Sequence, residues 1–402
     1  MAKRITRRNF LELGLTTMLS ACAPKIAASA TPDLAQTETR AKDTTLRSYL
    51  PDDPNILYTG RIDFSDARQP KFSAPGVYIR ARFRGTGASV RLADQFQYGT
   101  NRNYYDAVID DSTVVKIAPT PSSSSNTYEI KSDLPNAEHT LTLVKRTEAS
   151  IGFGQFLGFE FNGEILPAPA RPRRRMEFIG DSITCGTGDE ADYNSPQCTE
   201  DGWGQPYNNV RLAFGPVLAR SLGAEYQVSA VSGIGLTRNS SFRYDARPMP
   251  EVYDLLYFEQ KQSSLWDTTK YVPDAVVIGL GTNDFSPGDS DRPAMDVDIF
   301  AAAYVKFIGT LRGYYPKADI FCVSSPMLGD HWPKPTDQSA TDQKAAITKV
   351  VEEMNGRGDA KVHKFFVYPL SGGGCGTHPT ADQHALLANQ LRSYIAPVVG
   401  WS

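Results

Sequence analysis

The first part of the chain carries short hydrophobic runs in which apolar and polar residues alternate. From Asn55 to Glu164 these runs, such as GVYIRARFRG, SVRLADQF and HTLTLVKR, are separated by Gly, Pro, Asn and Ser, and no helical run intervenes. Alternation with a period of two places the apolar side chains on one face of a strand. Many short strands without helices are typical of a β-sandwich or jelly roll. We therefore predict an all-β jelly-roll sandwich domain over residues 45–164.

After Arg175 the pattern changes to continuous apolar runs of the kind found in buried parallel strands. The runs are MEFIG, EYQVSAV, DAVVIGLG, DIFCVSS and KFFVYPL. Helices are expected near residues 211–222, 298–314, 340–356 and 381–395. Alternating strands and helices predict a parallel, flavodoxin-like sheet with helices on both faces, an α/β domain over residues 176–402. The Pro- and Arg-rich residues 165–175 are interpreted as a solvated linker, and residues 238–270 as an irregular insertion.

The N-terminal sequence MAKRITRRNFLELGLTTMLSACAPK has the features of an export signal. Arg7 and Arg8 precede a mostly apolar stretch, as in twin-arginine signals, and LSAC resembles a bacterial lipobox. We predict removal of a signal peptide, residues 1–21, lipid attachment to Cys22, and a flexible tether over residues 22–44. The lipoprotein is then expected at the periplasmic face of a membrane, favouring the outer membrane, and attached only by this lipid. The alternative is a short amphipathic helix in the mature fold.

The composition is that of an ordinary globular protein, and its charge argues against one class of partner. Hydrophobic residues make up 41% of the 402 residues, charged residues make up 22%, and the formal net charge is −3. No basic face stands out, which argues against nucleic-acid binding. An oxidising compartment permits disulfides. Cys185 and Cys198 lie in one loop-like stretch and are predicted to pair, or to remain reduced; zinc binding is the rival interpretation, although CxxC spacing is absent from the sequence.

Four motifs follow predicted parallel strands, at the edge where open parallel sheets bind ligands. Ser182 lies in FIGDSITCG, Gly233 in SGIG, Asn283 in GLGTNDF and His378 in GTHP. A serine beside a histidine can act as a nucleophile, while a glycine N–H and an asparagine side chain can stabilise an oxyanion. Each motif alone also fits an ordinary helix cap or turn. Together they indicate an acyl transferase or hydrolase site.

The order Ser, Gly, Asn, His resembles that of the SGNH (GDSL-type) hydrolases. The resemblance implies that Ser182 is the nucleophile and His378 the base. It also implies that the N–H groups of Ser182 and Gly233 and the side chain of Asn283 form the oxyanion hole. Asp181 and Asp284 match family positions that shape loops.

Further segments are similar to carbohydrate esterase family two, in which a jelly roll precedes the SGNH domain. These segments are GRIDF, PGVYIRARFRG, HTLTLVKRTEA, CTEDGWGQPYNN and SGIGLTRN. This resemblance implies an acetylesterase of the acetyl xylan esterase type. Such an enzyme removes acetyl groups from plant polysaccharides or sugars, such as xylan and glucomannan, and prefers the primary 6-hydroxyl. It implies that neither a metal nor another cofactor is needed.

The expected acidic partner of His378 is missing. The wider hydrolase family has an aspartate three residues before the histidine, where this chain has Cys375; family two has it two residues before, at Gly376. A main-chain carbonyl from the 374–377 loop can replace the acid, because it selects the same imidazole tautomer. We predict such a Ser182–His378 dyad. Asp382 or Asp330 would be the alternative partner.

Three aromatic residues are candidates for stacking on a sugar ring: Trp332, Trp203 and Tyr207. The alternative is that they only pack loops. His384 is expected to be structural. Two other functions stay open at this point. One is a catalytically silent, carbohydrate-binding lipoprotein, motivated by the sandwich domain and the missing acid. The other is an esterase for lipids or for short acyl chains in general.

Overall fold

The computed structural model describes residues 46–96, 101–121, 126–196, 198, 205–287, 292–370 and 372–401. All of them belong to one compact unit that begins at Lys42. The predicted signal peptide, the Cys22 lipid site and the tether lie outside the described residues. Within the described ranges, no helix is long and apolar enough to cross a membrane.

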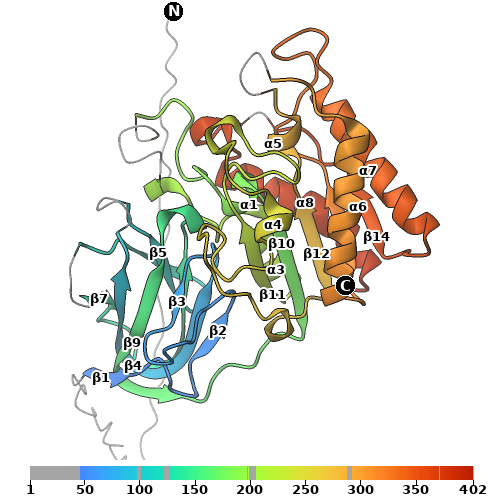
Figure 1. The fold of residues 1–402 in the computed structure, drawn as a ribbon. Coiled ribbons are helices and arrows are strands. Elements are labelled where there is room, and N and C mark those ends of the chain that lie inside the picture. Colours follow the sequence, from blue (N-terminus) through green and yellow to red (C-terminus); the bar gives the residue numbers. More distant parts are fainter. Residues whose placement is uncertain are drawn as a thin grey trace, which may run out of the picture. The chain divides into compact units, whose positions relative to one another are not determined.

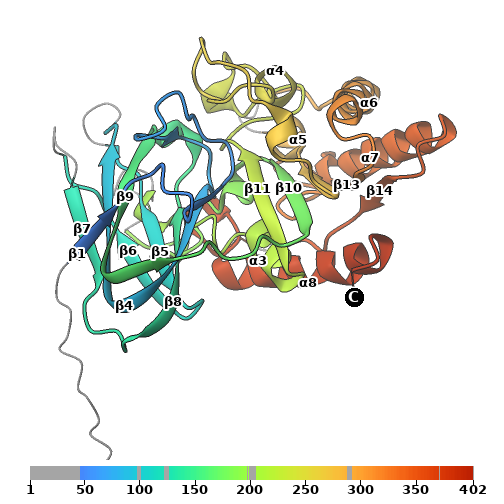
Figure 2. The ribbon, with the colours of Figure 1, turned by 90° about the horizontal axis from the view of Figure 1, so that it is seen from below.

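The N-terminal domain is an antiparallel β-domain, which confirms the all-β prediction. Figure 2 shows this domain beside the parallel sheet. Its strands join in one network in the order β1-β9-β4-β8-β5-β6, while β2 and β7 pair with β4 and β3 pairs with β9. The strands are β1 (Leu46–Tyr49), β2 (Leu57–Thr59), β3 (Lys71–Phe72), β4 (Tyr78–Asp94), β5 (Tyr105–Ile109), β6 (Thr113–Ile117), β7 (Asn126–Lys131), β8 (Ala137–Lys145) and β9 (Gly154–Leu166). The 3-10 turn η2 (Ala149–Ile151) separates β8 from β9.

Strand β4 is longer than the sequence pattern indicated. The runs GVYIRARFRG and SVRLADQF were expected as two strands, because Gly-Thr-Gly lies between them. In the structure they form one strand of 17 residues, with a register irregularity between Gly85 and Ala88. A side chain at Gly85 would collide with the main chain of Asn162 on β9. The glycine therefore allows two strands to approach closely and does not end the strand.

The C-terminal domain contains the predicted parallel sheet. Its order is β11-β10-β12-β13-β14, the doubly wound order of flavodoxin-like folds. The strands are β10 (Arg174–Gly180), β11 (Ala224–Ala230), β12 (Ala275–Gly279), β13 (Asp319–Val323) and β14 (Val362–Phe365). Gly180 at the end of β10 pairs with Ala230 and with Gly279. The carboxyl ends of the three neighbouring strands β11, β10 and β12 therefore meet at one edge of the sheet.

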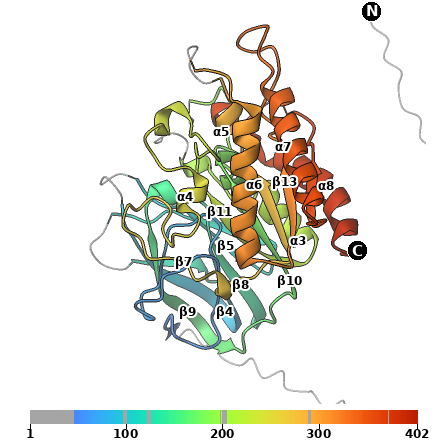
Figure 3. The same cartoon turned by 45° about the vertical axis from the view of Figure 1, so that its right-hand side comes forward.

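Helices cover both faces of this sheet (Figure 1 and Figure 3). Met176 and Phe178 of β10 belong to the core formed with α3 and α8, whereas Ile179 belongs to the core formed with α6 and α7. The longer helices are α3 (Phe214–Ser221), α6 (Val297–Tyr314), α7 (Ser339–Gly356) and α8 (Ala381–Val398); short ones are α1 (Ser182–Cys185), α4 (Met249–Val252) and α5 (Thr282–Phe285). The 3-10 turns η3 (Gln205–Tyr207), η4 (Ser241–Arg243), η5 (Thr268–Lys270) and η6 (Cys375–Thr377) lie in connecting loops. The insertion predicted at 238–270 contains η4, α4 and η5.

Buried polar contacts join the two domains. Arg61 donates to the carbonyls of Tyr253 and Leu255 and lies 3.6 Å from the carboxylate of Glu177, and both charged side chains are fully buried. The connector is not simply solvated as the sequence suggested. Its Arg171 donates to Glu225 at 2.8 Å, because the start of the parallel sheet lies against the β-domain. The two domains are consequently packed together through specific contacts.

Candidate active site

Ser182 is placed at the sheet edge by the end of β10 and the start of α1. Asp181 is the N-cap of α1, and its Oδ1 accepts a hydrogen bond from Ile183 N at 3.0 Å. This bond fixes the turn from strand to helix. Ser182 is thereby the first residue of the helix, where its own N–H has no intrahelical acceptor. The residue is buried, with 8% of its surface exposed.

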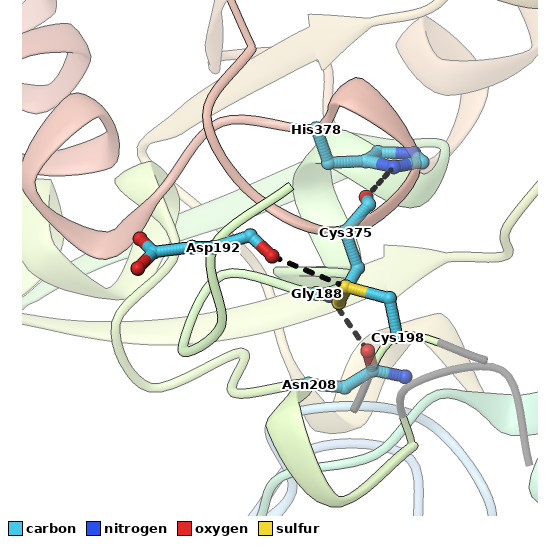
Figure 4. The surroundings of a disulfide bond; sticks show 6 residues. All are labelled: Gly188, Asp192, Cys198, Asn208, Cys375 and His378. Atoms are coloured by element: carbon cyan, nitrogen blue, oxygen red, sulfur yellow. Dashed lines mark hydrogen bonds between the residues drawn. A yellow bond between two sulfur atoms is a disulfide. The ribbon is translucent and has the colours of Figure 1, made fainter. Parts of the chain in front are cut away.

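His378 contacts Ser182 directly. Its Nε2 lies 2.7 Å from Ser182 Oγ. On the other side of the ring, Nδ1 donates to the Cys375 carbonyl at 2.9 Å, as Figure 4 shows. A carbonyl can only accept, so the proton resides on Nδ1. Nε2 then presents its lone pair to the serine hydroxyl. Such a pair can deprotonate the serine as it attacks an ester.

The turn before His378 brings the carbonyl into place. Gly376 (φ +61°) and Thr377 (φ +63°) both adopt left-handed conformations inside η6. The chain bends back, and the Cys375 carbonyl also accepts from His378 N at 3.2 Å. Helix α8 follows with the predicted capping box in its first turn. The acceptor thus comes from the loop in which the sequence analysis expected one.

Carboxylates proposed as alternatives lie elsewhere. Asp330 caps α7, where it accepts from Ala340 N and Thr341 N. Asp382 is exposed in the first turn of α8. Among the residues that the structure describes, no carboxylate is hydrogen-bonded to His378, whose Nδ1 is already engaged by the carbonyl.

Burial controls the charges around the pair. Desolvation lowers the pKa of His378 below its ordinary value, while the hydrogen bond to the Cys375 carbonyl acts in the opposite direction. His384 on α8 is fully buried and accepts from Phe214 N at 3.3 Å. Desolvation lowers its pKa to about 3, so it stays neutral and structural, as predicted. Burial raises the pKa of Asp181 to about 7.

Gly233 lies in the turn after β11, and its conformation requires glycine. Its φ is +75°, and a side chain there would meet Ser240 Oγ at 2.6 Å as well as the Phe242 ring. Its carbonyl accepts from Ser240 N at 2.8 Å. Within the described part of the chain, its N–H has no hydrogen-bond acceptor. That N–H can therefore serve an oxyanion.

Asn283 is tied to the same turn. It lies in α5, and its Nδ2 donates to the Ile234 carbonyl at 2.8 Å, which uses one of its two amide hydrogens. The neighbouring Asp284 is buried and accepts from Leu236 N and Thr237 N. Asp284 therefore shapes the SGIGLTR loop, as predicted, and the oxyanion candidates are held by one connected set of bonds.

Glu148 of the β-domain is a site residue that the sequence analysis missed. It is buried, and its Oε2 accepts from Ser232 N at 2.9 Å. Ser232 immediately precedes Gly233. The signal was a carboxylate in HTLTLVKRTEA, just after an apolar strand, where a charge needs a partner. The partner lies 84 residues away, so local sequence could not identify it.

The predicted pairing of Cys185 with Cys198 is wrong. Cys198 forms a disulfide with Cys375, 177 residues away, with Cα atoms 5.3 Å apart (Figure 4). Cys185 lies on α1, and its side chain is buried in the core shared with α3 and α8. Closeness along the chain misled the prediction, because the helix turns Cys185 away from the loop that contains Cys198.

The aromatic candidates have different surroundings. Trp332 follows β13 in an exposed loop, with 67% of its surface accessible and a cis bond to Pro333. Tyr207 lies in η3, and the Lys116 ammonium is 5.5 Å from its ring centroid. Trp203 lies outside the described residues. Trp332 is therefore the candidate with an open surface for a ligand.

The fold and the known families that it matches define a carboxylic ester hydrolase of the GDSL type. The family model described as GDSL-like Lipase/Acylhydrolase matches residues 178–386. The model described as Carbohydrate esterase 2 N-terminal matches residues 58–169. The chain belongs to carbohydrate esterase family 2.

Curated relatives and solved structures agree with this assignment. The chain is 38% identical over 357 residues to cellulase/esterase CelE of Acetivibrio thermocellus; the match covers 87% of this chain but spans only 40% of that protein. It is 31% identical to an acetylxylan esterase / glucomannan deacetylase of Cellvibrio japonicus, over 82% of this chain and 87% of the relative. A family two carbohydrate esterase from Clostridium thermocellum in complex with cellohexaose superimposes with a TM-score of 0.76 at 34% identity, covering 86% of this chain and all of that one.

Proposed function

We propose that the protein removes O-acetyl groups from plant polysaccharides or oligosaccharides such as xylan and glucomannan, including those on the primary 6-hydroxyl. The observation that carries the proposal is the contact between Ser182 Oγ and His378 Nε2 at 2.7 Å. It lies at the carboxyl edge of the parallel sheet, where the N–H groups of Ser182 and Gly233, which have no acceptor among the described residues, suit an oxyanion. The name of the Cellvibrio relative and the sugar complex of the Clostridium enzyme support an acetylated carbohydrate as the substrate.

The reaction follows from the geometry. Ser182 Oγ attacks the acetyl carbonyl as its proton passes to His378 Nε2. The oxyanion is stabilised by the N–H groups of Ser182 and Gly233 and by the Asn283 amide. His378 then gives this proton to the ester oxygen of the sugar as the C–O bond breaks, so the sugar departs with a free hydroxyl and an acetyl-serine remains. Water attacks this ester with His378 again as the base, acetate departs, and the serine is restored.

The Cys375 carbonyl takes the place of the acid in this dyad. It holds the tautomer with hydrogen on Nδ1 and offers a partial negative charge to the imidazolium. Replacing the aspartate by an amide in a trypsin-like protease costs roughly 10⁴ in rate, chiefly through the wrong tautomer. A carbonyl does not have that defect, since it cannot donate to Nδ1.

Other parts of the proposal concern substrate contact and location. Trp332, together with Trp203 and Tyr207, stacks on the sugar ring.

The antiparallel network folds as a jelly-roll sandwich over residues 45–164, followed by the linker and the catalytic domain at 176–402. The twin-arginine signal and a lipid on Cys22 place the enzyme at the periplasmic face of the outer membrane. Retention of mature protein in the membrane fraction, lost in Cys22→Ala, tests this location.

Acetate release from acetylated xylan and glucomannan by the wild type and Ser182→Ala tests the function. We expect release by the wild type only. Release by both proteins at equal rates would contradict the dyad, and turnover equal to buffer would favour a silent carbohydrate-binding protein. Chromogenic esters of increasing chain length test the remaining alternative, an esterase for lipids or for short acyl chains in general. A pocket that fits acetyl should give little activity on butyrate and longer esters.

A further inference from the structure

Cys375 is connected to the active site in two ways. Its main-chain carbonyl accepts from His378 Nδ1 at 2.9 Å, while its side chain forms the disulfide with Cys198 (Figure 4). The atom that orients the imidazole and the cross-linked sulfur thus belong to the same residue. A displacement of this residue moves the acceptor of the histidine directly.

The other end of the disulfide lies on the segment that follows the serine helix. Tyr193 N donates to the Gly373 carbonyl at 2.7 Å, and Cys375 N donates to the Gly188 carbonyl at 3.0 Å. Cys198 N is bonded to the Ser195 carbonyl at 3.0 Å. Together with the disulfide at Cys198, these main-chain bonds hold the histidine loop against Gly188 and Tyr193.

The histidine loop has few side chains that could hold it otherwise. Four of the five residues from Gly372 to Gly376 are glycine, and glycine loses more conformational freedom on ordering than any other residue. The side chain of Cys375 is buried, whereas Cys198 at the other end of the cross-link is half-buried. A covalent bond at this point restricts a segment whose sequence favours many conformations.

We propose that the Cys198–Cys375 disulfide is a positioning element of the esterase: it fixes the main-chain carbonyl that orients His378. This inference rests on the proposed function, because it assumes that His378 is the base. It assigns a catalytic consequence to the redox state of the protein. Pairing removes two protons and two electrons from the thiols, which a disulfide-bonded oxidoreductase of the oxidising compartment accepts as it becomes a dithiol.

The pH dependence of activity distinguishes positioning from simple stabilisation. The Cys375 carbonyl favours imidazolium and burial disfavours it. If the carbonyl moves away, the pKa of His378 falls, and the acid limb of the kcat/KM profile moves to lower pH. His384 is buried close enough for a charge on His378 to lower its pKa, but it stays neutral throughout because that pKa is about 3. Asp181 beside Ser182, with a pKa of about 7, is present in every variant, so comparison of profiles cancels its contribution.

The test uses Cys198→Ser, which removes the disulfide and retains Cys375 in the sequence. Kinetics on a chromogenic acetate ester should show kcat/KM reduced about 10- to 100-fold, since small misplacement of a catalytic group costs up to about 10². KM should change little, and the acid limb should lie at lower pH than in the wild type. A water-soluble phosphine should cause the same loss of activity in the wild type. The phosphine reduces the disulfide to two thiols and becomes a phosphine oxide, with its oxygen taken from water. It should not affect the variant.

Cys322→Ala is the matched control for lost stability. Cys322 is a free, fully buried cysteine of β13, so its truncation destabilises the protein while the disulfide remains. We expect a lower melting temperature with an unmoved acid limb. If Cys198→Ser, assayed without oxidant, keeps the wild-type kcat/KM and an unmoved acid limb, the proposal is overturned. An equal loss of kcat/KM in Cys322→Ala at matched stability would overturn it as well.

The two proposals fail in different ways. If the wild type has no esterase activity, the proposed function fails, but the imidazole can still be observed. In ¹⁵N spectra of histidine-labelled protein, the wild type should show His378 protonated on Nδ1, and Cys198→Ser should show a mixture of tautomers. One unchanged tautomer in both proteins would refute the positioning role whatever the activity.

Discussion

Replacement of Glu148 by alanine would test whether the β-domain takes part in catalysis. Glu148 Oε2 accepts from Ser232 N at 2.9 Å, one residue before Gly233. Burial raises the pKa of Glu148 above its ordinary value. Without this acceptor the partly buried Ser232 N–H loses its partner, which costs up to about 1–3 kcal/mol. The turn is then expected to shift, and the Gly233 N–H moves away from the oxyanion.

The expected magnitude follows from the contacts that remain. Complete loss of one oxyanion donor costs about 10²–10³ in kcat. In Glu148→Ala the turn is still held by the bond from Ser240 N to the Gly233 carbonyl, so we expect a reduction of about 10- to 100-fold. KM should stay near its wild-type value, because the interaction is made mainly in the transition state.

Two further variants complete the assay with a chromogenic acetate ester. Glu148→Gln keeps an acceptor oxygen and should lie closer to the wild type than to the alanine variant. Glu164→Ala removes an exposed carboxylate of β9 in the same domain and should leave kcat unchanged. Wild-type kcat in Glu148→Ala, with the protein folded, would refute the reasoning. Equal losses in the alanine and glutamine variants would show that charge, and not hydrogen-bond acceptance, matters.

Two other predictions concern pH and stability. His378 must be neutral to accept the serine proton, and burial lowers its pKa. The midpoint of its imidazole titration, followed by NMR, should therefore lie below pH 6.5, the ordinary value for histidine, and a midpoint above that value would contradict this assignment. Arg61→Ala leaves Glu177 buried without its cation and should reduce the free energy of unfolding by about 3–5 kcal/mol, measured by denaturant titration. Arg61→Lys, which keeps the charge, should lose less, and equal losses would point to packing alone.

The order of elements could be predicted because hydrophobic periodicity is local. The alternating runs before residue 165 and the continuous runs after Arg175 become the antiparallel and parallel sheets, and the four expected long helices are present. The shorter strand β14, Val362–Phe365, begins and ends earlier than the run KFFVYPL. Beyond the strand, Val367 N donates to Ser324 Oγ and Leu370 N to the Pro326 carbonyl. Apolar character alone does not distinguish such a segment from a strand.

What sequence could not provide are contacts between distant residues. Ser182, Gly233, Asn283 and His378 could be grouped, because strand ends of a parallel sheet share an edge. The partner of Cys375 could not be identified, since four cysteines after the predicted lipid site allow several pairings. Glu148 stayed unassigned for the same reason: its acceptor role depends on how two domains pack, and no local pattern encodes that packing.

The buried polar network explains why such packing matters for the site. Asp106 of β5 accepts from Arg146, Asn209 and Arg211, and Arg146 also pairs with Glu190. Asn209 and Glu190 belong to the segment between the serine helix and α3. Buried charges of this kind are costly unless every partner is present. The β-domain and this segment must therefore be ordered together, and separation of the domains would expose an unpaired network beside the disulfide that holds the histidine loop. The N-terminal domain is accordingly expected to support catalysis through position, whether or not it also binds sugar.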